Sequence, residues 1–347
     1  MIQEVSPAHM EKRPYVLILG SGEEAEKLSV RNRRSGSAAC KLLGCLSLNG
    51  SLPSKSTNSL PILGTSDALR EYVFRNPVDV VLVSVPLSPA SSKELLEPVL
   101  EIGLTAAIPE GISVSLEPNV LAKTLSHRQR FFGTDATLLT TVRQRQPYLT
   151  MKRIMDCVIS VAALIFFAPL FLMISVAIKL SSRKGPILYA WRVVGKNRKP
   201  FVGYKFRTMV PDADKLKKQL QAFNEMHGPV FKMRNDPRVF PFGHFLRKFS
   251  LDELPQLYSV LKGDMSLVGP RPPSAEEAER FEFWQRRKLS VKPGISCLWQ
   301  VNGRNEIRDF SEWARLDLEY IERASLLLDI KIMLRTIPAV LSGRGAS

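Results

Sequence analysis

One long apolar segment, from Ile154 to Leu180, constrains the fold of this chain more than any other part of its sequence. As an α-helix, a segment of this length can cross roughly 30 Å of hydrocarbon. A helix in a water-soluble protein rarely has so continuous an apolar surface, because one of its faces usually meets water. We therefore predict a membrane-associated helix over residues 151–184.

Basic residues flank this segment on both sides and limit how it can lie in a bilayer. Lys152 and Arg153 stand at its beginning, and Lys179, Arg183 and Lys184 stand at its end. Basic residues next to membrane segments tend to stay on the cytoplasmic side. Both ends of the segment are therefore expected on the same face of the membrane.

A proline near the middle of the segment offers a way to return the chain to that face. Pro169 cannot donate a backbone hydrogen bond, and its ring clashes with the carbonyl of Ile165 in a straight helix. We predict a break at Ala168-Pro169 and a re-entrant helix that dips into one leaflet. A kinked helix that spans the bilayer is the alternative.

The composition adds a strong charge imbalance, with 49 Lys and Arg against 33 Asp and Glu and a net charge of +16. Such an excess indicates an anionic partner, which can be nucleic acid, an acidic membrane surface or a phosphorylated substrate. The four cysteines lack the spacing of a zinc site or a disulfide framework, which favours reduced core residues. Residues 1–12 form a polar tail without the apolar region of a signal peptide, so such export is not expected.

Residues 13–126 alternate apolar runs with helix-like stretches, a pattern typical of a parallel sheet with crossover helices. The first run leads into Gly20-Ser21-Gly22 and a helix start, as in nucleotide-type α/β domains. We predict a Rossmann-like domain here, followed by a basic linker over residues 127–150. The strands are expected at Tyr15–Leu19, Leu42–Leu46, Val78–Val85 and Leu104–Ile108.

An acidic pair follows the membrane segment in Ser250-Leu251-Asp252-Glu253, whose spacing before an apolar run is that of a helix capping box. This structural role is compatible with chemistry. A carboxylate in the first turn of a helix faces the positive end of the dipole, stays ionised and lies near N–H groups that attract phosphate. Asp252 is therefore a candidate nucleophile on phosphorus, and Glu253 a candidate ligand for Mg²⁺.

Basic side chains surround this pair in the sequence. Arg247 precedes it, and Arg271 follows between two prolines that would hold it in one geometry for bidentate phosphate binding. A structural ion pair is the alternative role for Arg271. Lys205, Arg207 and Arg304 are further candidates for phosphate binding.

A short amphipathic helix is expected over residues 212–226. It would place Leu216, Leu220 and Phe223 on one face, with lysines around them. Such a helix either lies on an acidic membrane surface or packs against its own domain, and the pattern does not choose between the two.

A run of motifs in the C-terminal part of the chain carries a family resemblance. They are Tyr204-Lys205-Phe206-Arg207-Thr208-Met209, Asp236-Pro237-Arg238, Phe245-Leu246-Arg247-Lys248, Ser250 to Leu257, Leu261 to Pro272, Lys292-Pro293-Gly294-Ile295 and Val301-Asn302-Gly303-Arg304. From Lys152 onward the chain resembles the catalytic domain of the bacterial polyprenyl-phosphate sugar-phosphate transferases. These are monotopic phosphoglycosyl transferases that initiate exopolysaccharide and O-antigen assembly.

The resemblance implies roles for the acidic pair. Asp252 would attack the sugar-bearing phosphate of a UDP-sugar, expel UMP and form a covalent phosphosugar intermediate, which undecaprenyl phosphate then takes over. Glu253 would bind the Mg²⁺ cofactor. The family's re-entrant helix is broken at a proline, which matches Ala168-Pro169, although many members have Ser where this chain has Ala168.

The resemblance also implies a setting for the catalytic domain. Residues 185–347 would form a mainly α-helical catalytic domain that contacts membrane lipids at the cytoplasmic face of the bacterial inner membrane. No nucleic-acid partner is expected. The donor sugar and the oligomeric state stay open, with a homodimer as one alternative.

Two other function classes compete with this interpretation. The Rossmann-like domain could make the chain a nucleotide-sugar oxidoreductase or epimerase, but the third glycine of the dinucleotide fingerprint is missing after Gly20-Ser21-Gly22. We expect a structural or regulatory domain without a bound cofactor. The net charge would also fit a basic membrane scaffold or a nucleic-acid binder.

Overall fold

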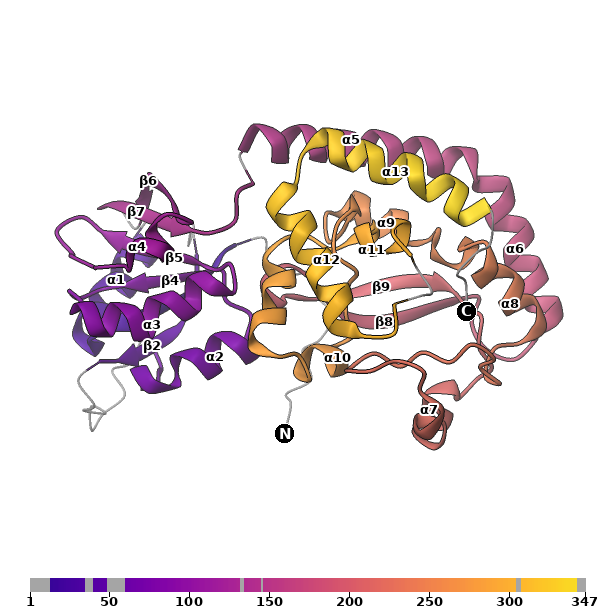
Figure 1. Cartoon of the computed structure of the whole chain (residues 1–347), viewed down its shortest axis with the longest axis horizontal. Helices are drawn as coiled ribbons and strands as arrows, with labels where there is room; N and C mark the ends of the chain where they lie inside the picture. The colour runs from indigo at the N-terminus through magenta and orange to yellow at the C-terminus, as the bar shows by residue number, and fades with distance from the viewer. Residues whose placement is uncertain are drawn as a thin grey trace. The chain divides into compact units, whose positions relative to one another are not determined.

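The computed structural model describes residues 13–34, 40–48, 60–131, 134–144, 146–303 and 307–341. The chain divides into two compact units, each treated separately below. The first comprises Met1–Arg143 with Asn197–Lys199, and the second comprises Gln144–Lys196 with Pro200–Ser347. Figure 1 shows the elements of both.

The first unit is built on a seven-stranded sheet of order β3-β2-β1-β4-β5-β7-β6. Neighbouring strands from β3 to β5 are parallel, and β7 and β6 are added antiparallel. The strands are β1 (Tyr15–Gly20), β2 (Lys41–Ser47), β3 (Ile62–Thr65), β4 (Val80–Val83), β5 (Thr105–Pro109), β6 (Leu125–Phe131) and β7 (Thr134–Thr140). The expected Rossmann-like parallel sheet and its four predicted strands are thereby confirmed.

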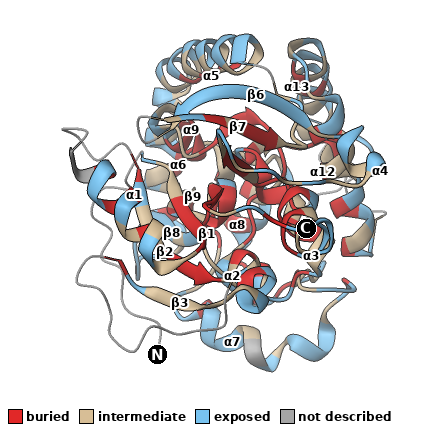
Figure 2. Ribbon diagram, turned by 90° about the vertical axis from the view of Figure 1, so that its left-hand side faces the viewer, coloured by how far each residue is buried: buried red, intermediate tan, exposed pale blue. Residues whose placement is uncertain are grey.

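Helices supply the crossover connections of this sheet, as the alternating pattern predicted. They are α1 (Gly22–Arg34), the 3-10 turn η1 (Ser66–Ala68), α2 (Leu69–Arg75), α3 (Pro89–Glu101) and α4 (Pro118–Leu121). The central strands are apolar throughout because both faces of the sheet are covered. Val16–Leu19 of β1 is fully buried, and the centre of the sheet appears red in Figure 2.

Much of the stretch expected as a linker, residues 127–150, instead belongs to regular elements. Residues 127–131 lie in β6 and residues 134–140 form β7, and α5 begins at Gln146. Strand β6 is the last of the sheet and its side chains are almost all exposed. Charged side chains such as Arg128 and Arg130 suit an exposed edge strand, because they discourage pairing with another chain. Such a strand lacks the apolar run that identifies buried strands.

The membrane segment forms two helices, α5 (Gln146–Phe166) and α6 (Ala168–Ser181), bent by 59° at Phe167. Within the described residues no single helix is long and apolar enough to cross a membrane, whereas this bent pair is when taken together. Pro169 lies in the first turn of α6, where its missing N–H interrupts no helical hydrogen bond. The predicted break at Ala168-Pro169 is confirmed.

The rest of the second unit is mainly helical around two small sheets. Strands β8 (Leu188–Val194) and β9 (Pro200–Phe206) pair antiparallel, and β10 (Ser266–Val268) pairs with β11 (Gly294–Ser296) in parallel. The helices are α7 (Ala213–Gln219), α8 (Pro241–Lys248), α9 (Gln256–Lys262), α10 (Ala275–Glu279), α11 (Leu298–Val301), α12 (Phe310–Arg323) and α13 (Leu326–Leu341). The 3-10 elements of this unit are η3 (Gln221–Phe223), η4 (Leu251–Glu253) and η5 (Phe283–Ser290), whereas most of η2 (Lys196–Arg198), between β8 and β9, belongs to the first unit.

The amphipathic helix expected over residues 212–226 is shorter than predicted. Helix α7 ends at Gln219, and the single turn η3 follows. Asp212, which precedes α7, has a left-handed backbone with φ of 63°, so a regular helix cannot begin there. Leu216 and Phe223 are exposed.

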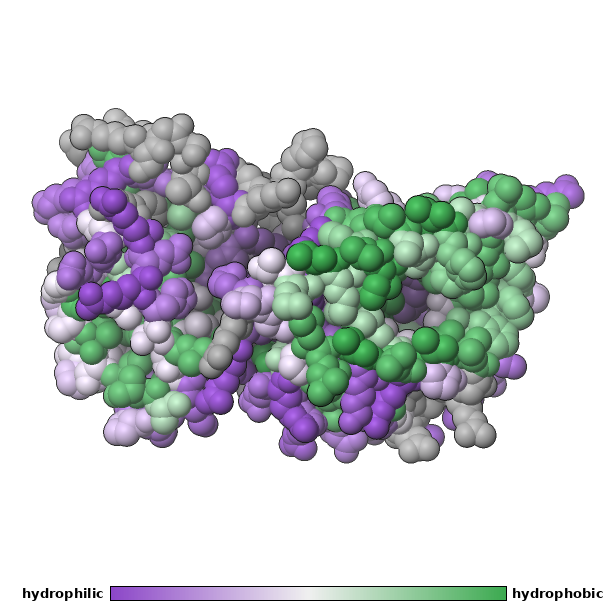
Figure 3. Space-filling model, turned by 90° about the horizontal axis from the view of Figure 1, so that it is seen from above, coloured by the Kyte–Doolittle hydropathy of each residue, from purple (hydrophilic) through white to green (hydrophobic). Residues whose placement is uncertain are grey.

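One face of the bent pair packs into the unit, and the other is bare. Ile174 and Ile178 of α6 join a core cluster with Phe206, Phe240 and Leu246. Large apolar side chains lie exposed on the outer faces of α5, α6 and α13, and Figure 3 shows them gathered on this unit. They are Met151, Ile154, Val158, Ile159, Val161, Ile165, Phe166, Leu172, Met173, Val176, Leu180, Leu327, Ile330, Leu334, Ile337 and Leu341.

Candidate active site

Asp252 and Glu253 lie in the single 3-10 turn η4, and the helix that follows, α9, begins only at Gln256. The predicted capping box is wrong. Ser250 has a left-handed backbone, with φ of 51° and ψ of 23°, and its side chain makes no capping hydrogen bond. A capping residue normally has an extended backbone, which directs its side chain at the first N–H groups of the helix.

Burial, rather than a helix dipole, governs the ionisation of Asp252. The side chain is only 8% exposed, and loss of solvation raises its pKa to about 6. The Lys205 ammonium opposes this rise, the Glu253 carboxylate adds to it, and the Arg247 guanidinium opposes it again. The carboxyl is therefore mainly ionised at pH 7, because nearby cations compensate part of the desolvation.

Lys205 and Arg247 bracket the acidic pair from two different elements. The Lys205 ammonium, on β9, lies 2.5 Å from Glu253 Oε1. Arg247, at the end of α8, donates from Nε to the Thr208 hydroxyl at 3.0 Å. Burial lowers the pKa of Arg247, whereas the negative charge of Asp252 raises it. Two cations predicted from the sequence thus stand beside the predicted nucleophile.

Arg207 and Arg271 also line the pocket, but in different settings. Arg207 donates to the backbone carbonyl of Ser182 at 2.7 Å and to that of Pro186 at 2.5 Å, so its guanidinium holds the end of α6 against β9. Arg271 is more open: it is 3.8 Å from Glu277 and lies over the Trp313 ring. Arg304, the remaining predicted phosphate ligand, lies outside the described residues.

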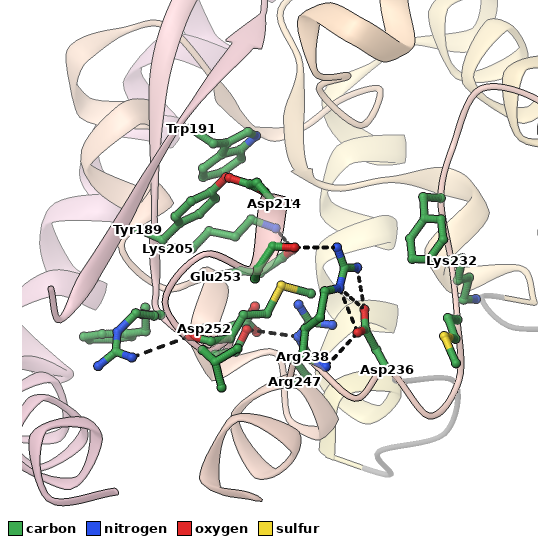
Figure 4. Close-up of a pocket in the computed structure, with 18 of the residues that line it drawn as sticks. Tyr189, Trp191, Lys205, Asp214, Lys232, Asp236, Arg238, Arg247, Asp252 and Glu253 are labelled. Atoms are coloured by element: carbon green, nitrogen blue, oxygen red, sulfur yellow. Dashed lines mark hydrogen bonds and ion pairs between the residues drawn. The ribbon is translucent and has the colours of Figure 1, made fainter. Parts of the chain in front are cut away.

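These side chains open into one pocket of about 600 Å³ in the second unit. Figure 4 shows the acidic pair and Lys205 on one side, and Arg238 and Asp236 on another. The pocket is lined by Pro186, Tyr189, Trp191, Lys205–Asp214, Val230–Met233, Asp236, Arg238, Arg247, Asp252, Glu253, Arg271, Trp299, Gln300 and Trp313. A cavity of this size accommodates a nucleotide-sized ligand.

Asp236 and Arg238 were not among the site residues predicted from the sequence, although their motif contributed to the resemblance. The Arg238 guanidinium donates to both carboxylate oxygens of Asp236, and both residues are buried. Burial alone would raise the pKa of Asp236, but the hydrogen bonds from Arg238 outweigh it and lower that pKa. The pair is a fixed wall of the pocket, and its short spacing was the signal that could have identified it.

Several carboxylates line the pocket, but they do not gather into a site for a resident metal among the described residues. Among the described residues no cluster of three or more His, Cys, Asp or Glu side chains could bind an ion. Mg²⁺ usually binds through one or two carboxylates together with substrate phosphates and water. Glu253 and Asp252, adjacent on one turn, fit this second mode of binding.

The glycine turn of the first unit has a packing explanation. A Cβ at Gly20 would lie 1.8 Å from the Ser84 hydroxyl, so glycine is needed where β1 passes β4. Glu23 and Glu24 occupy the first turn of α1, and both pair with Lys27. Their negative charge is unfavourable at the position where a dinucleotide would place its pyrophosphate.

The second unit matches a family model. The model described as bacterial sugar transferase matches residues 147–343. The undecaprenyl-phosphate galactose phosphotransferase of Salmonella typhimurium is 42% identical over 56% of this chain and 41% of its own length. The UDP-glucose:undecaprenyl-phosphate glucose-1-phosphate transferase of Xanthomonas campestris is 35% identical over 83% of this chain and 58% of its length.

A shorter relative is covered almost completely. The exopolysaccharide production protein ExoY of Sinorhizobium fredii is 39% identical over 56% of this chain and 87% of its own length. Several longer relatives are covered over only 41% to 63% of their length.

Proposed function

Because the chain belongs to the bacterial sugar transferase family, we propose that it transfers a sugar 1-phosphate from a UDP-sugar to undecaprenyl phosphate, for polysaccharide synthesis. The observation that carries the proposal is the buried carboxylate of Asp252 between the cations of Lys205 and Arg247, inside a nucleotide-sized pocket. A carboxylate that has lost much of its solvation, but remains ionised, is suited to attack phosphorus.

In the first half of the reaction, a carboxylate oxygen of Asp252 bonds to the phosphorus that carries the sugar. The bond from that phosphorus to the bridging oxygen breaks, and the electron pair leaves with UMP. The sugar phosphate is then held on Asp252 as an acyl phosphate. Lys205, Arg247 and Arg271 supply positive charge for the phosphate oxygens, which is the main need of phosphoryl transfer.

In the second half, a phosphate oxygen of the lipid acceptor attacks the same phosphorus. The bond to Asp252 breaks, the carboxylate is restored and the lipid carries a diphosphate sugar. Glu253, with Asp252 beside it, would hold Mg²⁺, which supplies charge neutralisation to the donor phosphates when bound. Division into two displacements lets a water-soluble donor and a lipid acceptor use one site in turn.

The bent pair α5–α6 accounts for access to the lipid. Its exposed apolar side chains require a nonpolar environment, and we propose that it forms a re-entrant helix on the cytoplasmic face of the bacterial inner membrane. Arg207 joins the C-terminal end of α6 to β9, the strand that carries Lys205. The membrane helix and the pocket are therefore connected by direct hydrogen bonds.

The proposal is tested by UMP release from a panel of UDP-sugars in membrane preparations, with and without Mg²⁺. Asp252→Asn should abolish release and prevent the formation of a phosphosugar-protein adduct detectable by mass spectrometry. The matched control is Asp135→Asn, on an exposed position of the first unit, which should leave the rate unchanged. Full turnover by Asp252→Asn would exclude the nucleophile assignment.

A further inference from the structure

Two aromatic rings open into the pocket from strand β8. The Tyr189 and Trp191 rings are nearly parallel, at 5°, with their centroids 6.5 Å apart. Tyr189 is exposed and Trp191 is half-buried, whereas Trp299 and Trp313, also in the pocket wall, are buried and stack on one another. Tyr189 and Trp191 therefore offer ring surface to a ligand (Figure 4).

The Trp191 ring is held in place by the strand opposite. Trp191 faces Gly203 of β9 in the hairpin register, and a Cβ at Gly203 would lie 2.8 Å from the ring carbons. The ring can lie against β9 only because residue 203 has no side chain. A rigid aromatic surface is pre-organised for stacking, which lowers the entropic cost of binding.

This aromatic surface lies next to the reacting groups. The Lys205 ammonium is 5.0 Å from the centroid of the Trp191 ring and 2.5 Å from Glu253 Oε1. One side chain therefore contacts both the aromatic surface and the acidic pair. In a UDP-sugar, the sugar is joined to the attacked phosphorus through a single oxygen, whereas the uracil is separated from it by a second phosphate and a ribose.

A carboxylate lies beside the rings. Asp214 of α7 accepts a hydrogen bond from the Tyr189 hydroxyl at 3.4 Å and is exposed at the pocket. A negative charge repels a diphosphate but accepts hydrogen bonds from hydroxyl groups. Aromatic surface together with a carboxylate acceptor suits a pyranose ring, which has apolar C–H faces and hydroxyl edges.

We propose that Tyr189 and Trp191 form the surface on which the transferred sugar of the donor stacks, with Asp214 as an acceptor for its hydroxyls. The inference rests on the proposed function and adds the position of the sugar. Trp191 is thereby a binding residue whose loss weakens contact with the sugar, and Gly203 is a positioning residue that acts through Trp191.

The test measures equilibrium binding by calorimetry to the purified full chain carrying Asp252→Asn, so that no turnover is needed. UDP is compared with UDP-glucose, UDP-galactose and UDP-N-acetylglucosamine, each with and without Trp191→Ala. We expect Trp191→Ala to weaken the tightest-binding UDP-sugar about tenfold, as loss of an aromatic contact does, and to leave UDP unchanged. Asp214→Ala should act in the same direction, and Trp284→Ala, outside the pocket wall, should not.

Equal weakening of UDP and UDP-sugar by Trp191→Ala would place uridine on the rings and overturn the inference. Unchanged affinity for every ligand, or failure of all UDP-sugars to bind, would overturn it as well. The proposed function fails separately, if the native chain releases no UMP from any donor.

Gly203→Ala tests the positioning role of Gly203 independently, by the same binding measurements. It should weaken sugar binding when Trp191 is present and have no further effect in the Trp191→Ala background, because both changes act through one ring. Additive effects of the two changes would contradict the role of Gly203.

Discussion

At the scale of single residues, the environment of Asp252 sets how the rate should depend on pH. Its pKa is raised to about 6, above the ordinary value of an aspartic acid, so the ionised fraction falls as pH decreases through 6. If Asp252 is the nucleophile, UMP release at pH 5 should be about tenfold below its plateau near neutrality. Initial rates of UMP release between pH 4.5 and 8 measure this acidic limb of the pH–rate profile. Circular dichroism over the same range confirms that the protein stays folded.

Replacement of Lys205 provides a second test of Asp252, because it should shift the pH dependence of the rate in a known direction. Its ammonium lowers the pKa of Asp252, so Lys205→Gln should move the acidic limb of the profile to higher pH. The change also removes one ion-pair partner of Glu253, and the less compensated negative charge of Glu253 would act in the same direction. A limb that stays at its original pH in the variant would show that another group controls it.

At the scale of elements, helices α5 and α13 are joined by a buried ion pair. Lys152 Nζ lies 2.8 Å from Asp329 Oδ2, and the Tyr320 hydroxyl donates to Asp329 Oδ1 at 2.7 Å. Asp329→Ala leaves the Lys152 ammonium buried without its carboxylate, which should cost about 3–5 kcal/mol of stability. Thermal unfolding in detergent measures the loss.

Two further variants separate the buried charge from simple loss of contact. The double change Lys152→Met with Asp329→Leu replaces the pair by apolar side chains and should recover most of the melting temperature. Arg323→Ala removes an exposed ion pair with Glu319 and should have almost no effect. A double variant as unstable as Asp329→Ala would contradict the electrostatic explanation.

The bend between α5 and α6 makes a prediction about topology. In a re-entrant helix, both ends lie on one side of the membrane, because the chain returns to the face from which it entered; here α5 and α6 are bent by 59° at Phe167. Single cysteines at Met151 and Leu180, both exposed, in a chain without its native cysteines, should react with an impermeant thiol reagent from the same side. Labelling from opposite sides would favour a kinked spanning helix.

The elements also show what the sequence could predict. Strands β1, β2, β4 and β5 were found because strands covered on both faces are continuous apolar runs. Strand β6 was missed because its exposed, charged side chains resemble those of a loop. The break at Pro169 followed from local stereochemistry alone, but the left-handed backbone of Ser250 depends on the surrounding structure and could not be anticipated.

The same distinction applies to the site. Asp252, Glu253, Lys205 and Arg247 were named from motifs, and the structure gathers them in one pocket. The aromatic surface of Tyr189 and Trp191 was not predicted from the sequence. Trp191 reaches the pocket through its register with Gly203, and register is not encoded in the local sequence of either strand.

At the scale of the whole molecule, the second unit holds every residue that lines the pocket. The family match begins at residue 147, after the last strand of the first unit. The ExoY relative of Sinorhizobium fredii is covered over 87% of its length by just over half of this chain. These observations place the residues of the proposed chemistry in the second unit and not in the Rossmann-like sheet of the first unit.

We therefore predict that a chain shortened to residues 144–347 retains UMP release within a few fold of the full chain, at unchanged KM for the donor. The physical reason is that the bent pair, the Lys152–Asp329 ion pair and the pocket all lie within these residues. Steady-state kinetics of both proteins in the same lipid mixture measure the difference. A shortened chain with native circular dichroism but no turnover would instead assign the Rossmann-like unit a direct part in catalysis, which the charge at the start of α1 argues against.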